Sequence, residues 1–295
     1  MAKSEPKSQS RILFFWNRFK RNRIAVLGVM VVIGYILMAI FAPFTSPHNP
    51  NESDLSRRLQ PPFFLKGGDW RYPLGCDHLG RDILSRIIYG SRISIFIGVA
   101  VVAASAAIGT LFGLLAGYYG GRLDSVVCMV VDILLAFPFL IFAIALMAAT
   151  GPGLGNIILA LTYKGWVPFC RVVRGDTLVA KKIEYVEAAR AMGASSWRIM
   201  LKEILPNVFT PVLVLATLNV ATVIIIEASL SFLGLGVQPP TPVWGSMVNE
   251  GREHLLSAWW ISTFPGLAIL IMVLGVNLFG QGLRDAFDPR LTEEA

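Results

Sequence analysis

The stretch Lys181–Pro206, KKIEYVEAARAMGASSWRIMLKEILP, is a charged segment within the otherwise hydrophobic second half of the chain. Its first half predicts a helix that Asp176 or Thr177 is placed to cap. Apolar residues recur there at spacings of four and three, at Val179, Ile183 and Val186. Gly193 ends the pattern, as a glycine does where the chain turns sharply.

A second short helix is predicted after Gly193, with Ser195 as its cap and Pro206 at the start of the next hydrophobic run. Its apolar face has the spacing i, i+3, i+4 and i+7, at Trp197, Met200, Leu201 and Ile204. Two short helices joined at a glycine form a knob that fits a groove on another protein. An amphipathic helix lying on lipid headgroups has the same pattern, and periodicity alone leaves both interpretations open.

Composition places the chain in a membrane. Of its 295 residues 55% are hydrophobic and 15% charged, with a mean hydropathy of +0.62. A soluble domain carries roughly 25% charged residues. The net charge of +7 suggests basic cytoplasmic loops rather than nucleic-acid binding. The three cysteines, Cys76, Cys128 and Cys170, show neither a disulfide framework nor metal-ligand spacing.

Six membrane spans are predicted. Ile24–Ala42 is an uninterrupted apolar run, long enough to cross a bilayer core of about 30 Å. A signal peptide is the alternative, but the run is long for one and lacks a small-x-small cleavage site. The other five spans are Ile93–Gly117, Ser125–Ala149, Leu154–Phe169, Val208–Leu235 and Trp259–Phe279.

The distribution of basic residues predicts the orientation. With the N-terminus inside the cell, the cytoplasmic pieces are 1–23, 118–124, 170–207 and 280–295, and they hold 17 of the 26 Lys and Arg residues. This bias follows the positive-inside rule, so both termini and the 181–206 loop are expected in the cytoplasm. In the second span, Gly109, Gly113 and Gly117 predict close packing against another helix.

No catalytic residue and no metal site is predicted. The chain lacks a G-x-x-x-x-G-K-[ST] loop, so it has no usual phosphate cradle for ATP. Its three histidines are isolated, and neither H-E-x-x-H nor a nucleophile elbow occurs. Enzyme activity in this chain is therefore not expected.

Three charged residues fall within predicted spans: Asp132, Lys164 and Glu227. Such groups are expensive in hydrocarbon, so each lines a substrate path or gate, or pairs within the bundle. Pairing is favoured for Asp132, and snorkelling toward the cytoplasmic interface near Arg171 for Lys164. Glu227 is equally suited to pairing and to the outer mouth of a path for a cationic substrate. The three do not form a proton-relay series.

Glu187-Ala188-Ala189, then Gly193 and Leu205-Pro206, resemble the EAA loop of ABC importer permeases; Glu203 stands where that pattern has isoleucine. The resemblance implies that this loop docks onto a cytoplasmic ATPase subunit. It implies a coupling role for Glu184, Glu187, Ala188, Ala189, Met192, Gly193, Trp197, Leu205 and Pro206.

Three further stretches, Gly80–Arg92, Leu230–Gly245 and Gly282–Arg290, resemble the C-type permeases of dipeptide, oligopeptide and nickel importers. The resemblance covers about residues 12–292. It implies an all-α integral membrane protein with the type I ABC importer (MetI-like) permease fold, in a bacterial inner membrane. The implied partners are a second, homologous permease subunit, two ATPases that bind ATP and Mg, and an external binding protein. This subunit itself is expected to hold no cofactor.

The family pattern also implies the domain organisation. A cytoplasmic tail (1–23), a peripheral first helix (24–42) and an external loop (43–92) precede a five-helix core (93–283), which carries the coupling loop (171–206); a cytoplasmic tail (284–295) follows. Peptide is the favoured substrate over nickel, because no span carries the clustered His, Cys or carboxylate ligands of a metal path. A self-sufficient secondary transporter would show inverted repeats and paired broken helices, which the sequence does not show.

The outer loop before the last span carries Pro239, Pro240 and Trp244. It is rigid and partly aromatic, and it is predicted to form a gate or a docking surface for the binding protein. A structural re-entrant loop without such a contact is the alternative.

Overall fold

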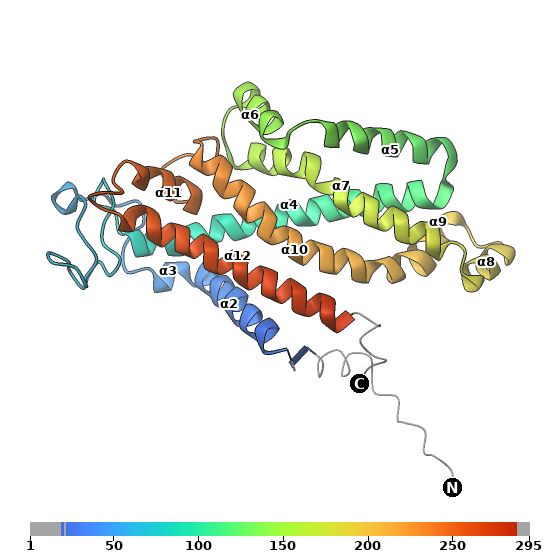
Figure 1. Cartoon of the computed structure of the whole chain (residues 1–295), viewed down its shortest axis with the longest axis horizontal. Helices are drawn as coiled ribbons and strands as arrows, with labels where there is room; N and C mark the ends of the chain where they lie inside the picture. Colours follow the sequence, from blue (N-terminus) through green and yellow to red (C-terminus); the bar gives the residue numbers. More distant parts are fainter. Residues whose placement is uncertain (1–18, 21, 288–295) are drawn as a thin grey trace, which may run out of the picture.

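The computed structural model describes residues 19–20 and 22–287, so most of the predicted N-terminal tail and the end of the C-terminal tail lie outside the described residues. Within these residues the fold is all-helical and has no strand, as predicted (Figure 1). The helices, with two short segments η1 and η2, are α2 (Arg23–Ile40), α3 (Ala42–Thr45), η1 (Leu55–Arg57), α4 (Ile83–Tyr119), α5 (Gly121–Ala136), α6 (Phe139–Thr150), α7 (Leu154–Ala180), α8 (Glu184–Ala191), α9 (Ser196–Arg198), η2 (Ile199–Ile204), α10 (Leu205–Phe232), α11 (Trp244–Arg252) and α12 (Trp260–Phe287).

Helix α4 begins ten residues before the predicted start at Ile93. Asp82 is its N-cap, with a carboxylate that accepts a hydrogen bond from the Ser85 amide at 3.1 Å. The helix has 37 residues, and at 1.5 Å per residue it extends about 55 Å, well beyond a bilayer core. The sequence did not indicate this start, because the first turns of α4 contain the polar residues Ser85 and Arg86. They are buried in the structure, where Arg86 contacts Asp77 of the preceding loop.

The predicted span Ser125–Ala149 is wrong as a single helix. Helices α5 and α6 meet at an angle of 86° across Phe137 and Pro138. Pro138 has no amide hydrogen to donate and disfavours helical geometry at Phe137, so an apolar run that looks continuous is broken here.

Among the described residues, four helices are long and apolar enough to span a membrane: α2, α4, α10 with the α9–η2 segment before it, and α12. The count is five if the bent α5–α6 pair forms one span. The predicted count of six is not confirmed. Helix α7 ends at Ala180 rather than Phe169, and its charged residues dilute its hydropathy. Asp176 and Thr177 therefore lie inside α7, and the prediction that they cap the next helix is wrong.

Helices α4 and α7 form the most extensive helix pair, and glycines make their close approach feasible. A Cβ atom added at Gly113 would lie 2.8 Å from both the Cys170 carbonyl oxygen and the Val173 Cβ. One added at Gly109 would lie 2.4 Å from the Trp166 carbonyl oxygen, and one at Gly117 2.7 Å from the Thr177 Cβ. The predicted small-residue packing face is confirmed.

Helix α2 packs along α12, on the side of the bundle away from α5 and α6 (Figure 1). Gly28 and Gly275 allow this contact, since a Cβ at Gly28 would lie 2.6 Å from the Phe279 amide nitrogen. The Tyr35 hydroxyl donates to the Ala268 carbonyl at 3.0 Å. Most of the remaining surface of α2 is apolar and exposed, which suits a helix that faces lipid.

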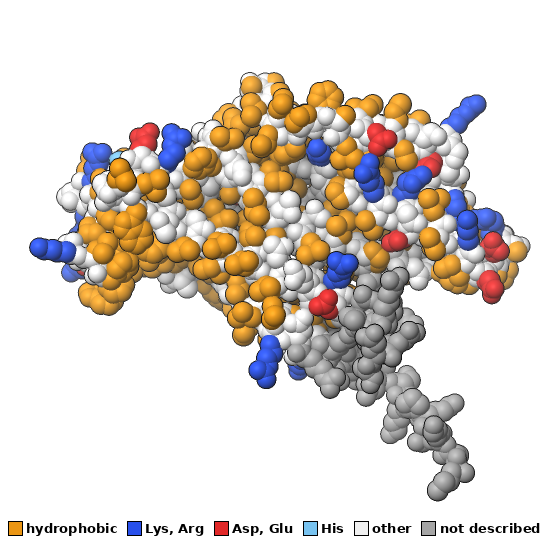
Figure 2. All heavy atoms as spheres, viewed as in Figure 1, with side chains coloured by type: hydrophobic (Ala, Val, Ile, Leu, Met, Phe, Trp, Pro, Cys, Tyr) orange, Lys and Arg blue, Asp and Glu red, His pale blue; other side chains and the backbone are white. Residues whose placement is uncertain are grey.

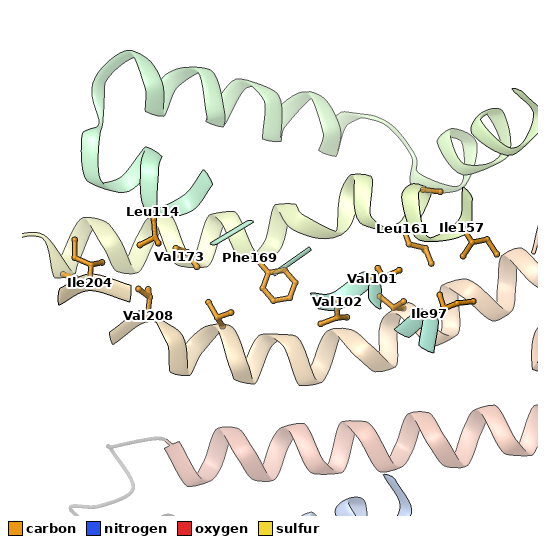
Figure 3. Packing of buried hydrophobic residues seen from close by; sticks show 14 of the residues in the cluster. Ile97, Val101, Val102, Leu114, Ile157, Leu161, Phe169, Val173, Ile204 and Val208 are labelled. Atoms are coloured by element: carbon orange, nitrogen blue, oxygen red, sulfur yellow. The ribbon is translucent and has the colours of Figure 1, made fainter. Parts of the chain in front are cut away.

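The largest buried cluster lies where α4, α7 and α10 meet (Figure 3). Its members are spread along these helices and include Ile97, Leu114, Phe169, Val173 and Val208. In the view of Figure 2 hydrophobic side chains cover much of the surface, and charged side chains lie at both ends and at several points between the middle and the right-hand end. The cluster continues into the 181–206 loop, so this loop is built on the core.

Candidate coupling site and translocation path

The first half of the 181–206 loop, which is predicted to couple to an ATPase, forms helix α8. Ile183 precedes the helix at the N-cap without a side-chain hydrogen bond. Val186 and Ala189 are buried and join the main cluster, next to Ile199 and Ile204 of η2. Because helical residues three apart share a face, the opposite face of α8 points outward.

Gly193 makes the turn that the sequence predicts. Its φ is +81°, in the left-handed region that favours glycine. The Gly193 amide donates to the Arg190 carbonyl and the Ala194 amide to the Ala189 carbonyl, each at 3.0 Å. These two bonds form a Schellman motif, which satisfies the last carbonyls of α8 and redirects the chain.

The second half of the loop is not a separate short helix. A single turn, α9, runs into the π-helical segment η2, which continues into α10. Ser195 occupies the N-cap position, but its side chain makes no capping bond. The Leu205 amide donates to the Met200 carbonyl, five residues back, and Pro206 has no amide to donate in this register.

A hydrogen-bonded cluster ties α8 to α10. The Asn207 side-chain amide donates to the Glu203 carbonyl at 2.6 Å and to the Tyr185 hydroxyl at 2.7 Å. The Tyr185 hydroxyl donates to the Glu203 carbonyl at 3.3 Å, so this carbonyl accepts two hydrogen bonds. The loop is thereby fixed to α10. Sequence reasoning missed this cluster because it depends on the shifted register of η2.

A second set of contacts fixes the loop to the end of α4. The Lys181 ammonium donates to the Gly117 carbonyl at 2.7 Å. The Arg190 guanidinium lies 5.6 Å from the centre of the Tyr118 ring. These contacts place positive charge at the C-terminal end of α4, where the helix dipole favours it.

The exposed face of the loop carries apolar and acidic side chains. Met192 is 82% exposed and Trp197 54%. Ala188, Glu184 and Glu187 are also exposed, as is Pro206, whereas Leu205 is half-buried. Large exposed apolar side chains beside charged ones are typical of a protein-interaction surface.

Asp132 pairs with a basic residue across two helices, as the sequence favoured. The Arg171 guanidinium of α7 lies 3.1 Å from the Asp132 carboxylate of α5. Both side chains are open to the surface, Asp132 71% and Arg171 57% exposed. A second pair, Arg174 with Asp124 at 2.7 Å, was not predicted, because Asp124 precedes the predicted span.

Lys164 does not snorkel toward the cytoplasmic interface, so that prediction is wrong. Its ammonium donates to the Phe137 carbonyl at 3.1 Å, at the break between α5 and α6. The break leaves this carbonyl without the partner it would have in a continuous helix. The lysine therefore finds an acceptor within the helical bundle.

Glu227 does not lie at an open outer mouth, as one of its two predicted roles required. It is completely buried between α10 and α4. Its carboxylate accepts hydrogen bonds from Ser231 at 2.7 Å and from Ser94 at 3.3 Å. Glu227 thus connects α10 to α4, in agreement with its other predicted role, pairing within the bundle.

The segment between α10 and α12, which the sequence predicts as a gate or docking surface, has an exposed part and a buried part. Pro239 and Pro240 are exposed. Trp244 is fully buried and donates from its indole nitrogen to the Ile87 carbonyl at 3.0 Å, so its predicted place on a docking surface is wrong. A buried indole needs a hydrogen-bond acceptor, and the second turn of α4 supplies it.

A buried charge network at the outer end was also missed. The Arg86 guanidinium lies 3.2 Å from Asp77 and 3.0 Å from Glu250 of α11, and Arg81 contacts the same two carboxylates. These pairs fix residues 75–82 to α4 and α11. Burial in this region raises the pKa of Cys76 to about 12, so this thiol stays protonated at neutral pH.

The apolar helices and the exposed loop are the features expected of a membrane permease. Residues 109–293 match the model of the binding-protein-dependent transport system inner membrane component. Residues 13–62 match the N-terminal transmembrane domain of oligopeptide transport permease C. The chain belongs to this permease family, as the EAA-like loop predicts, and it is a multi-pass inner-membrane component of an ABC importer.

Several relatives cover nearly the whole chain. The di/tripeptide transport system permease protein DppC of Pseudomonas aeruginosa is 42% identical over 95% of this chain and 93% of its own length. The dipeptide transport system permease protein DppC of Escherichia coli K12 is 44% identical over 98% of this chain and 97% of its own. The glutathione transport system permease protein GsiD of Pectobacterium atrosepticum is 44% identical over 94% of this chain and 90% of its own.

A solved structure supports the fold. A chain of the MetNI methionine ABC transporter, in inward-facing conformations, superposes with a TM-score of 0.56, covering 69% of this chain and 97% of that chain. The identity is 20%, so this similarity shows the fold alone. The predicted type I importer fold is confirmed.

Proposed function

We propose that this chain is one of two permease subunits of an ATP-driven importer of short peptides. The observation that carries the proposal is the Schellman turn at Gly193, which presents Met192 and Trp197 on a loop fixed to α10. Peptide as the substrate is supported by relatives named as di- and tripeptide permeases at 42–44% identity.

The 184–206 loop docks into a cytoplasmic ATPase, one of two in the complex. Those ATPases bind ATP and Mg and hydrolyse ATP, and this chain holds no cofactor. When the ATPases close, they push on α8, and its bonds to Glu203 and Asn207 carry the movement into α10. A second, homologous permease completes the path, and both termini lie in the cytoplasm.

An extracytoplasmic binding protein delivers the peptide at the opposite end of the molecule. There Pro239 and Pro240 are exposed on the loop after α10, supported by the buried Trp244. The outer charge network around Arg86 holds the surrounding loop in place. This end is therefore rigid enough to receive a partner without refolding.

Uptake into proteoliposomes tests the proposal. The complete transporter, with this chain, its partner permease, both ATPases and the loaded binding protein, is expected to accumulate a radiolabelled dipeptide only with ATP on the nucleotide side. Omitting this chain is expected to reduce uptake to background. ATP-dependent accumulation of nickel but of no peptide, or accumulation by this chain alone, would contradict the proposal.

A further inference from the structure

A pocket opens at the break between α5 and α6. Its volume is about 180 Å³, ample for ordered water or a small polar group. Its walls are mainly aromatic, from Phe137, Phe139, Phe142 and Tyr163, and its one charged lining residue is Lys164. The rings of Phe142 and Tyr163 stack at a centroid distance of 4.2 Å, which gives one wall a fixed shape.

Lys164 brings a positive charge into this pocket without a carboxylate beside it. Arg171 and Arg174 on the same helix each pair with an aspartate of α5. Lys164 forms no ion pair within the described residues, and its recorded contact is the Phe137 carbonyl at 3.1 Å. An ammonium has three N–H donors, so this bond leaves two available to a ligand.

The break adds further positive potential. Helix α6 starts at Phe139 without a side-chain cap, and its first amides have no helical partner. Pro138, before it, has no amide at all. The positive end of the α6 dipole therefore lies beside the pocket that Lys164 enters, and both favour an anion.

The pocket lies on a face of the bundle that carries an ion pair open to the surface. Only α5, α6 and α7 line it, and these helices lie away from α2 and α12 (Figure 1). The same face carries the open Asp132–Arg171 pair. Exposed charges at the depth of a span face water or protein, so this face meets the second permease or the path between the two subunits.

We propose that the Lys164 pocket is a transient subsite for the C-terminal carboxylate of the transported peptide. The ammonium binds the carboxylate, and the aromatic walls contact the adjacent side chain without selecting its identity. This inference rests on the proposed function and specifies which end of the substrate the chain recognises. The weak retention that one ammonium provides suits a site that must release its ligand.

The test compares a dipeptide with its C-terminal amide in the reconstituted transporter, using saturating amounts of each loaded on the binding protein. The measured quantity is the ratio of acid to amide uptake. Any preference of the binding protein contributes equally to wild type and variant, so it cancels. We expect Lys164→Gln to lower this ratio about tenfold, because it removes a charge-assisted hydrogen bond. Lys164→Arg should preserve it.

Lys66→Gln, which removes an exposed charge of the outer loop, is the matched control and should leave the ratio unchanged. Equal loss of both peptides in Lys164→Gln would mean that the lysine only stabilises the helix break or binds a lipid phosphate, and would overturn the proposal. An unchanged ratio would overturn it as well. If the wild-type transporter accumulates neither peptide, the proposed function itself fails.

Discussion

Replacing Gly193 by valine should abolish ATP-driven uptake while the chain stays in the membrane at its normal level. A Cβ atom at this exposed position would meet nothing within 4 Å, so the effect is conformational. A β-branched residue is an outlier at a φ of +81° and strains the Schellman turn. The turn would open and α8 would lose its orientation relative to α10.

The measurement is peptide uptake divided by the amount of chain in the membrane fraction. Gly193→Asn is the control, because asparagine tolerates the left-handed region and should retain much of the activity. Glu187→Lys reverses a charge on the exposed face of α8 without touching the turn, and should also abolish uptake. Normal uptake by both Gly193→Val and Glu187→Lys would contradict the coupling role of the loop.

Gly113→Leu should have the largest effect on stability. The leucine Cβ would lie 2.8 Å from the Cys170 carbonyl oxygen and 3.0 Å from the Arg174 amide nitrogen, which are backbone atoms of α7. Helices α4 and α7 would have to separate, and overpacking of a buried contact costs about 1–3 kcal/mol or more. We expect a lower unfolding midpoint in detergent and little chain in the membrane.

The matched control is Gly266→Leu in α12, where an added Cβ meets nothing within 4 Å. It should leave the unfolding midpoint close to that of the wild type. If Gly113→Leu is as stable as Gly266→Leu, the α4–α7 contact can accommodate a larger side chain, which would contradict the close packing of these helices.

Local signals with one physical cause were predictable from the sequence. Gly193 stands where a periodic pattern ends, and a left-handed turn is what such a glycine most often provides. The glycines of α4 at a spacing of four predicted their packing face in the same way. Asp132 required a partner, and its pairing with Arg171 follows from the cost of a charge in a span.

Features that depend on tertiary contacts were not predictable. The break at Pro138 is different, since the proline itself is a local signal; it was missed because the span was predicted from hydropathy, which does not register a proline within an apolar run. The start of α4 was missed because a charged residue such as Arg86 indicates a loop. Its burial depends on ion pairs with Asp77 and Glu250, which the sequence does not show. Glu227 and Trp244 are buried by contacts with α4, more than a hundred residues away in sequence.

The coupling role of the 184–206 loop is the central claim, and crosslinking tests it most directly. Ala188→Cys places a thiol on the exposed face of α8, whereas the native Cys76 and Cys170 are buried and Cys128, half-buried, would be replaced by serine. We expect a crosslink to a co-expressed ATPase whose yield changes when ATP is added. Uptake that continues while no ATPase is captured would contradict the claim.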